Sequence, residues 1–127
     1  MTESNLQIVE RLYAAFGRRD IAEVFRLLSP DVEITQSEDL PWGGTYRGHE
    51  GAREFFGKLA ANLHSTLEIE RKIRAGDSIA AVGWTQGTVN ATGAHFRVPI
   101  VHVWDVADGL IQRARTAVLI SEQTLSK

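Results

Sequence analysis

The chain has 127 residues, of which 14 are Lys or Arg and 16 are Asp or Glu, for a formal net charge of −2. This length is typical of one domain, 1–127, and the balanced charge lacks the basic patch that nucleic-acid binding requires. The absence of Cys excludes disulfides, and the polar N-terminus and short apolar runs favour a cytoplasmic protein that does not contact membranes.

Two helices are predicted at the N-terminal end. Ser4 and Gln7 have the spacing of a capping box, in which each side chain satisfies the free backbone N–H of the other residue. Apolar residues then recur at three- and four-residue steps and mark one helix face: Leu6, Val9, Leu12, Tyr13 and Phe16. We expect this helix to end at 17–19, and a second helix to run from Asp20 to the helix breaker Ser29-Pro30.

A strand, a loop and a third helix follow. Val32 and Ile34 alternate with polar residues, which is typical of a half-buried strand. The loop Gln36–Gly48 carries two acids and a Trp among glycines and a proline that restrict its backbone, so we interpret it as the lip of a pocket. The third helix begins near Gly48 or His49, and its apolar side is formed by Ala52, Phe55, Phe56, Leu59 and Leu63.

Beyond this helix the apolar period changes from 3.6 to 2, which predicts four strands joined by short turns. They cover residues 67–74, 79–89, 95–106 and 110–120, and Asp108-Gly109 is a strong hairpin signal between the last two. Helices that come early and strands that come late indicate an α+β fold, with the helices packed on one face of an antiparallel sheet.

The strand 95–106 predicts an assembly as well as a sheet. Its even-numbered residues include Phe96, Ile100 and Trp104, and its odd-numbered residues include Val101 and Val103. Both faces are therefore apolar in the middle, whereas the helices cover only one. We expect a second subunit to cover the other face, which gives a homodimer formed through the sheet.

Four segments together carry a family resemblance: LYAAFGRRD in the first helix connection, SPDVEI entering the first strand, PWGGTYRGHEGAREFF entering the third helix, and VHVWDVADGLI at the last hairpin. Their order and spacing resemble the SnoaL-like branch of the nuclear transport factor 2/ketosteroid isomerase superfamily. The resemblance implies a cystatin-like α+β cone, in which a curved, mainly antiparallel mixed sheet wraps around three N-terminal helices. It also implies an apolar pocket inside the cone and usually a dimer. Because such cones host isomerases, cyclases, dehydratases, hydrolases and non-catalytic binders, function must be argued from the pocket residues.

The catalytic groups of the best-known relatives map incompletely onto this chain. The Tyr position of the steroid isomerases falls on Leu12, with Tyr13 next to it, and the positions of their base and their oxyanion-binding acid fall on Gln36 and Val101. Neither Gln36 nor Val101 can supply that proton chemistry, so steroid isomerisation by that mechanism is not expected. In the SnoaL-type polyketide cyclases, the positions of the acid/base Asp and the orienting His correspond to Thr116 and His102. This chain therefore has the histidine, His102, but has Thr116 in place of the acid/base Asp.

The candidate catalytic residues are His102, Asp39 and Glu38. Histidine titrates in the range where enzymes work, and a carboxylate at an apolar pocket mouth has its pKa raised by desolvation, which suits a base. The alternative interpretation is a core or dimer-face histidine and two solvated loop acids.

Further residues are candidates for ligand contacts or for the pocket wall: Tyr13, Gln36, Trp42, Phe56, Trp84, Val101 and Thr116. Trp42 either stacks on a ligand or anchors its loop on the third helix. The isomerase comparison points Val101 into the cone, and a regular strand would then turn His102 outward unless a bulge intervenes.

These residues predict a small-molecule pocket protein. Its chemistry would be a cofactor-free acid/base reaction of the isomerase, cyclase or dehydratase type on a small, apolar, oxygenated carbonyl compound. The alternative is a non-catalytic ligand-binding or dimerisation module. Neither a phosphate-binding loop nor metal-ligand spacing occurs in the sequence, so no cofactor and no metal site are expected.

Overall fold

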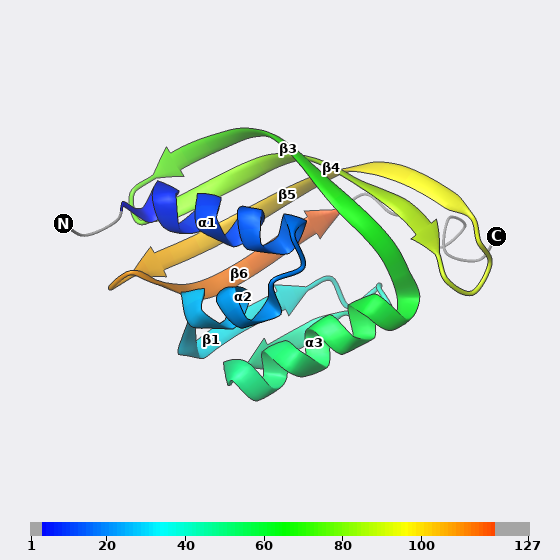
Figure 1. Cartoon of the computed structure of the whole chain (residues 1–127), viewed down its shortest axis with the longest axis horizontal. Coiled ribbons are helices and arrows are strands. Elements are labelled where there is room, and N and C mark those ends of the chain that lie inside the picture. The colour runs from blue at the N-terminus through cyan, green and yellow to red at the C-terminus, as the bar shows by residue number, and fades with distance from the viewer. Residues whose placement is uncertain (1–3, 119–127) are drawn as a thin grey trace.

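The computed structural model describes residues 4–118 and contains three helices and six strands (Figure 1). In chain order these are α1 (Asn5–Gly17), α2 (Ile21–Leu27), β1 (Leu28–Gln36), β2 (Gly44–Arg47), α3 (Gly48–Asn62), β3 (Leu63–Ala75), β4 (Ser78–Val89), β5 (His95–Ala107) and β6 (Leu110–Val118). The predicted end of the last strand at Ile120 lies outside the described residues.

All six strands form one curved sheet in the order β2-β1-β6-β5-β4-β3. Neighbouring strands are antiparallel except β1 and β6, which are parallel. The three helices lie on one side of this sheet, as Figure 1 shows. We call the helix-covered side the inner face and the opposite side the outer face. The predicted α+β architecture is confirmed.

The helix signals of the sequence are confirmed in atomic detail. Ser4 Oγ accepts a hydrogen bond from the Gln7 backbone N–H at 3.2 Å, and Gln7 Oε1 accepts one from the Ser4 backbone N–H at 2.8 Å. The Asp20 side chain accepts a hydrogen bond from the Glu23 backbone N–H and so caps α2. Because these caps satisfy donors that the helix cannot satisfy itself, they determine where both helices begin.

The structure corrects three predicted boundaries. The segment expected to be a loop throughout contains β2, which pairs with β1 and forms an edge of the sheet. Strand β1 begins at Leu28 and includes Ser29-Pro30, and a register shift between Leu28 and Glu33 accommodates the proline. Leu63 starts β3 and does not belong to the helix. Each error reflects the pairing of a strand with a neighbour, which the local pattern of the segment does not record.

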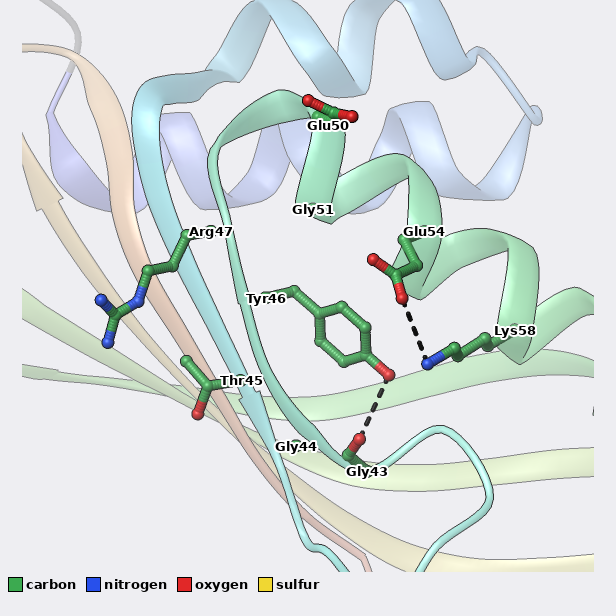
Figure 2. Close-up of a pocket in the computed structure, with 9 residues that line it drawn as sticks. All are labelled: Gly43, Gly44, Thr45, Tyr46, Arg47, Glu50, Gly51, Glu54 and Lys58. Atoms are coloured by element: carbon green, nitrogen blue, oxygen red, sulfur yellow. Dashed lines mark hydrogen bonds and ion pairs between the residues drawn. The ribbon is translucent and has the colours of Figure 1, made fainter.

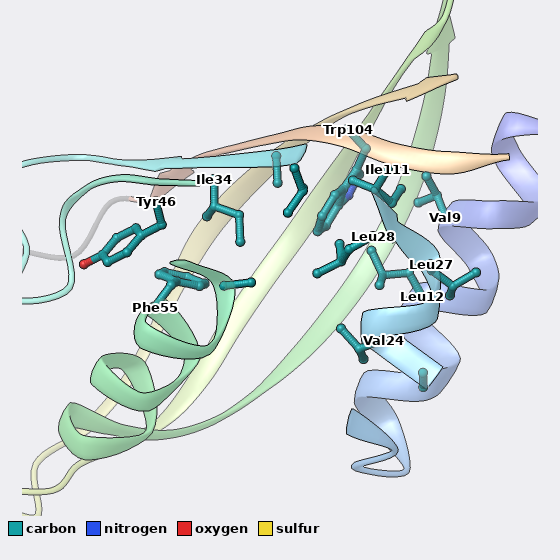
Figure 3. Close-up of a cluster of buried hydrophobic side chains, with 14 of the residues drawn as sticks. Val9, Leu12, Val24, Leu27, Leu28, Ile34, Tyr46, Phe55, Trp104 and Ile111 are labelled. Carbon is teal, nitrogen blue, oxygen red and sulfur yellow. The ribbon is translucent and has the colours of Figure 1, made fainter. Parts of the chain in front are cut away.

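The core fills the space between the inner face and the helices (Figure 3). Val9 and Leu12 from α1 and Ile111 from β6 are fully buried there. Trp104 projects from β5 into the same cluster, with 6% of its surface exposed. No helix within residues 4–118 combines the length and apolar character needed to cross a membrane.

Candidate functional site

A row of polar side chains crosses the inner face of the sheet. His102 on β5 pairs with Thr116 on β6, and the β1–β6 register places Ile34 beside Ala114. Because side chains alternate between faces, Gln36 and Thr116, two residues further along, lie next to each other on the same face. Gln36 and His102 are 7% and 8% exposed. We call Gln36, Thr116 and His102 the inner polar row.

Helix α1 adds a hydroxyl group to this row. The Tyr13 hydroxyl oxygen lies 2.6 Å from His102 Nδ1, and the Trp104 indole N–H donates to the same oxygen at 2.9 Å. The rings of Tyr13 and His102 stack with centroids 5.8 Å apart, and Trp104 meets both rings at steep angles. Three aromatic side chains thus hold one another in a single arrangement.

Burial favours the uncharged forms of Tyr13 and His102. Desolvation lowers the pKa of His102 to about 4, since a buried imidazolium loses its hydration. Desolvation also raises the pKa of Tyr13 well above its ordinary value, although the hydrogen bond from Trp104 acts in the opposite direction. The pair therefore exchanges hydrogen bonds as neutral groups.

Two groups of the inner polar row are without a hydrogen-bond partner in the described part of the chain. Within residues 4–118, neither the His102 Nε2 atom nor the Gln36 side-chain amide makes a hydrogen bond to the protein. In the same part of the chain, no side-chain nitrogen or oxygen is both completely buried and unpartnered. These atoms are therefore still reached by solvent and are available to a bound molecule. Phe16 and Phe56, whose rings contact each other, continue the aromatic surface beyond Tyr13.

The loop acids do not join this row. Glu38 and Asp39 are exposed in the segment after β1, and the polar partners of the His102 ring in the described part of the chain are limited to Tyr13. Trp42 is 3% exposed and belongs to the core, where its backbone carbonyl accepts a hydrogen bond from the Tyr46 hydroxyl at 3.1 Å. Its anchoring role, one of the two interpretations of this residue, is the one that the contacts support.

Val101 and Trp84 lie on the outer face, so their predicted place in the pocket is wrong. Val101 alternates with buried His102 on a regular stretch of β5, and Trp84 alternates with buried Gly83 and Thr85 on β4. Glu70 accepts a hydrogen bond from the Trp84 indole, and the guanidinium carbon of Arg97 lies 4.1 Å from the Trp84 ring centroid. Because successive residues of a regular strand lie on opposite faces, only His102 of these two β5 residues lies on the inner face.

Trp104 is the site residue that the sequence argument missed. The alternation of the strand predicts Trp104 on the same face as His102, two positions away, but gives it no role in the site. An indole N–H that is buried needs an acceptor, and that requirement is the signal by which Trp104 could have been found. Among the residues predicted for the apolar face of the first helix, Tyr13 is the one whose side chain can accept this hydrogen bond.

A separate hollow of about 420 Å³ lies between β2 and α3 (Figure 2). Its walls are the backbone of 43–47 and the charged side chains of α3, of which Lys58 pairs with Glu54 at 3.3 Å. The Tyr46 hydroxyl donates to the Gly43 carbonyl at 3.1 Å, and both residues line the hollow. None of the predicted site residues lines this hollow, so it is distinct from the inner polar row.

The order of these elements and the row inside the sheet agree with a known family. A model of the SnoaL-like domain matches residues 9–114. The chain belongs to the SnoaL-like family. In this SnoaL-like protein His102 faces the helices and pairs with Thr116 on the neighbouring strand.

Solved structures similar to this SnoaL-like protein extend over nearly the whole chain. An NTF2-like protein from Burkholderia thailandensis is 31% identical, with a TM-score of 0.90, and the match covers 99% of this chain and 100% of that one. TerC, co-crystallised with polyporic acid, is 28% identical, with a TM-score of 0.80 and 89% of each chain covered. The cystatin-like, NTF2-like fold predicted from the sequence is thereby confirmed.

A curated relative matches a shorter stretch of this SnoaL-like protein. The uncharacterized protein Rv0034 of Mycobacterium tuberculosis is 31% identical over 67 residues. That stretch is 53% of this chain and 51% of Rv0034, so the match spans about half the length of the relative.

Proposed function

We propose that this protein binds a small, largely apolar carbonyl compound against the inner face of its sheet and transfers a proton at the carbon next to the carbonyl. One observation carries the proposal. His102 is buried, neutral and held by Tyr13, while its Nε2 atom has no protein partner within residues 4–118. An accessible nitrogen in apolar surroundings is a specific attachment point for one polar atom of a ligand.

The proposed chemistry follows from the hydrogen-bonding capacity of His102. The Nε2–H group donates to the carbonyl oxygen of the ligand. A base removes the proton from the adjacent carbon, the C–H electron pair becomes a C=C bond, and the carbonyl π electrons move onto oxygen. The enolate oxygen then accepts a stronger hydrogen bond from His102 than the carbonyl did, which stabilises the transition state. No cofactor takes part in this step.

The base in this proposal is a loop carboxylate, Asp39 or Glu38. Both follow Gln36 closely in the chain, and Gln36 is the end of the inner polar row. Adjacent strands are about 4.8 Å apart, so Gln36 lies roughly 10 Å from His102 across Thr116. A ring compound of modest size spans that distance, with its reacting carbon toward the loop. TerC, the relative co-crystallised with polyporic acid, supports a compact organic ligand of this kind.

Hydrogen exchange in 1-indanone tests this function. In D₂O, we expect the wild-type protein to accelerate deuterium incorporation at the carbon next to the carbonyl, as followed by proton NMR. His102→Leu removes the donor at similar volume and should reduce the protein-dependent rate about 100-fold, the usual effect of deleting one oxyanion donor. Asp39→Asn and Glu38→Gln identify the base.

The matched control is His95→Leu, which removes an exposed histidine from the same strand. It should exchange indanone at the wild-type rate. Exchange that persists in His102→Leu would contradict the proposed role of His102.

A non-catalytic binder is the second candidate, and the exposure of Glu38 and Asp39 favours it. A protein that only binds would show saturable NMR shifts with 1-indanone or polyporic acid and no exchange above the rate in buffer. Under that outcome the inner polar row is a binding site alone.

We also propose that the protein forms a homodimer through the outer face. Ala80, Val82, Val101 and Val103 are half-buried on this face although no helix within residues 4–118 covers it, and Ile73 beside them is 43% exposed. Val101→Lys places a charge in the middle of this surface and should convert a dimeric mass to a monomeric one in light scattering at micromolar concentration. Ile21→Lys, on exposed helix α2, is the control and should stay dimeric. A monomeric wild type would contradict the dimer.

A further inference from the structure

The hydrogen bond from Trp104 determines whether the Tyr13 hydroxyl acts as donor or acceptor toward His102. An indole nitrogen is a donor only, so the 2.9 Å contact means that the Tyr13 oxygen accepts from Trp104. The hydroxyl proton must then go to another acceptor. Within residues 4–118, the only other polar partner of this hydroxyl is His102 Nδ1, at 2.6 Å. Leaving a largely buried hydroxyl proton unpaired would cost about 1–3 kcal/mol, so Tyr13 donates to Nδ1.

This direction determines the tautomer of the imidazole. A neutral imidazole carries one proton, and an Nδ1 that accepts from Tyr13 leaves this proton on Nε2. The chain of hydrogen bonds therefore runs from Trp104 to Tyr13, from Tyr13 to His102, and from His102 outward. Its last member, Nε2–H, is a donor that is not completely buried and can reach a bound molecule.

We infer that Trp104 is a positioning residue that, through Tyr13, holds His102 as the Nε2–H tautomer, so that the site selects ligands with a hydrogen-bond acceptor and rejects those that offer only a donor. This inference rests on the proposed ligand site and adds its specificity. The titratable group that faces His102 from α1 is Tyr13. Ala81 of β4 and Thr116 of β6, its neighbours in the sheet, carry no charge. The charged residues of β6, Arg113 and Arg115, are exposed and pair with Asp105.

The tautomer is measured directly by two-bond ¹H–¹⁵N correlation NMR of the ligand-free protein at pH 7. In the wild type we expect a protonated, pyrrole-type Nε2 and an unprotonated, pyridine-type Nδ1. In Trp104→Phe and in Tyr13→Phe, each of which keeps an aromatic ring, both nitrogens should shift toward intermediate values because the two tautomers exchange. A variant that merely loosened the core would not move the nitrogen signals in this way. If Trp104→Phe does not fold, Tyr13→Phe still tests the inference.

The specificity is tested with two bicyclic probes of similar size. 1-Indanone offers only an acceptor and indole offers only a donor. We expect wild-type protein to bind 1-indanone at least about tenfold more tightly than indole, because a buried donor facing a donor stays unpaired. In Tyr13→Phe this ratio should fall toward one.

Two different failures can be told apart. A wild-type His102 protonated on Nδ1, or tighter binding of indole, overturns this inference and leaves the proposed ligand site standing. An Nε2–H tautomer with no binding of either probe supports the proton arrangement, contradicts the proposed function and overturns the selection of acceptors.

Discussion

Lowering the pH from 7 to 4 should destabilise the protein by about 3 kcal/mol through His102 alone. Burial lowers the pKa of this imidazole in the folded protein to about 4, whereas the unfolded chain has the ordinary value of 6.5. The unfolded state therefore takes up a proton first as the pH falls. The stability is fully present above pH 6.5 and is lost progressively as the pH approaches 4.

The measurement is urea unfolding of the wild type and of His102→Gln between pH 7 and pH 4. Glutamine does not titrate, and its side-chain oxygen can accept from the Tyr13 hydroxyl, so the variant keeps that contact. The difference in unfolding free energy between the two proteins should shrink by about 3 kcal/mol over this range, since carboxylate contributions cancel in the comparison. A constant difference would mean that His102 is not buried as a neutral group.

Replacing Gly83 with Ala should destabilise the protein by about 2–3 kcal/mol, because the added methyl group meets backbone atoms and not a side chain that can move. A Cβ atom at this position would lie 1.9 Å from the Glu68 carbonyl oxygen and 2.8 Å from the Ile69 Cα. Gly83 pairs with Ile69 where β3 carries one extra residue, Glu70, before Arg71 continues the ladder. The backbone of β3 occupies the space that a side chain would need at this bulge, so only a residue without a side chain fits.

The control is Gly57→Ala on α3. A Cβ atom there has no neighbour within 4 Å, and alanine is favoured over glycine inside a helix by about 1 kcal/mol. Chemical denaturation should therefore show opposite signs for the two glycine substitutions. Equal or inverted effects would mean that β3 and β4 are further apart at Gly83 than described.

Part of the candidate site could be predicted from the sequence. Comparison with the cyclases and isomerases selected Gln36, His102 and Thr116, and the structure places all three in one row. The sequence placed Tyr13 one residue from an isomerase position, and the helix turns its hydroxyl toward His102. Val101 was misplaced because a strand inverts its faces with every residue, so an error of one position in the comparison moves a side chain from the pocket to the outer face.

Local interactions determined what the sequence alone could establish. Capping at Ser4 and Asp20, the apolar spacing of α1 and the Asp108-Gly109 turn act over a few residues, and each was readable before the fold was known. Tyr13 and His102, in contrast, are 89 positions apart, and their contact depends on how α1 crosses the sheet and which face of β5 it meets. Only tertiary packing determines the path of α1 across the sheet and the face of β5 that it meets. It therefore decided that His102 faces inward, that the Trp104 indole donates to the Tyr13 hydroxyl and that Glu38 and Asp39 are exposed.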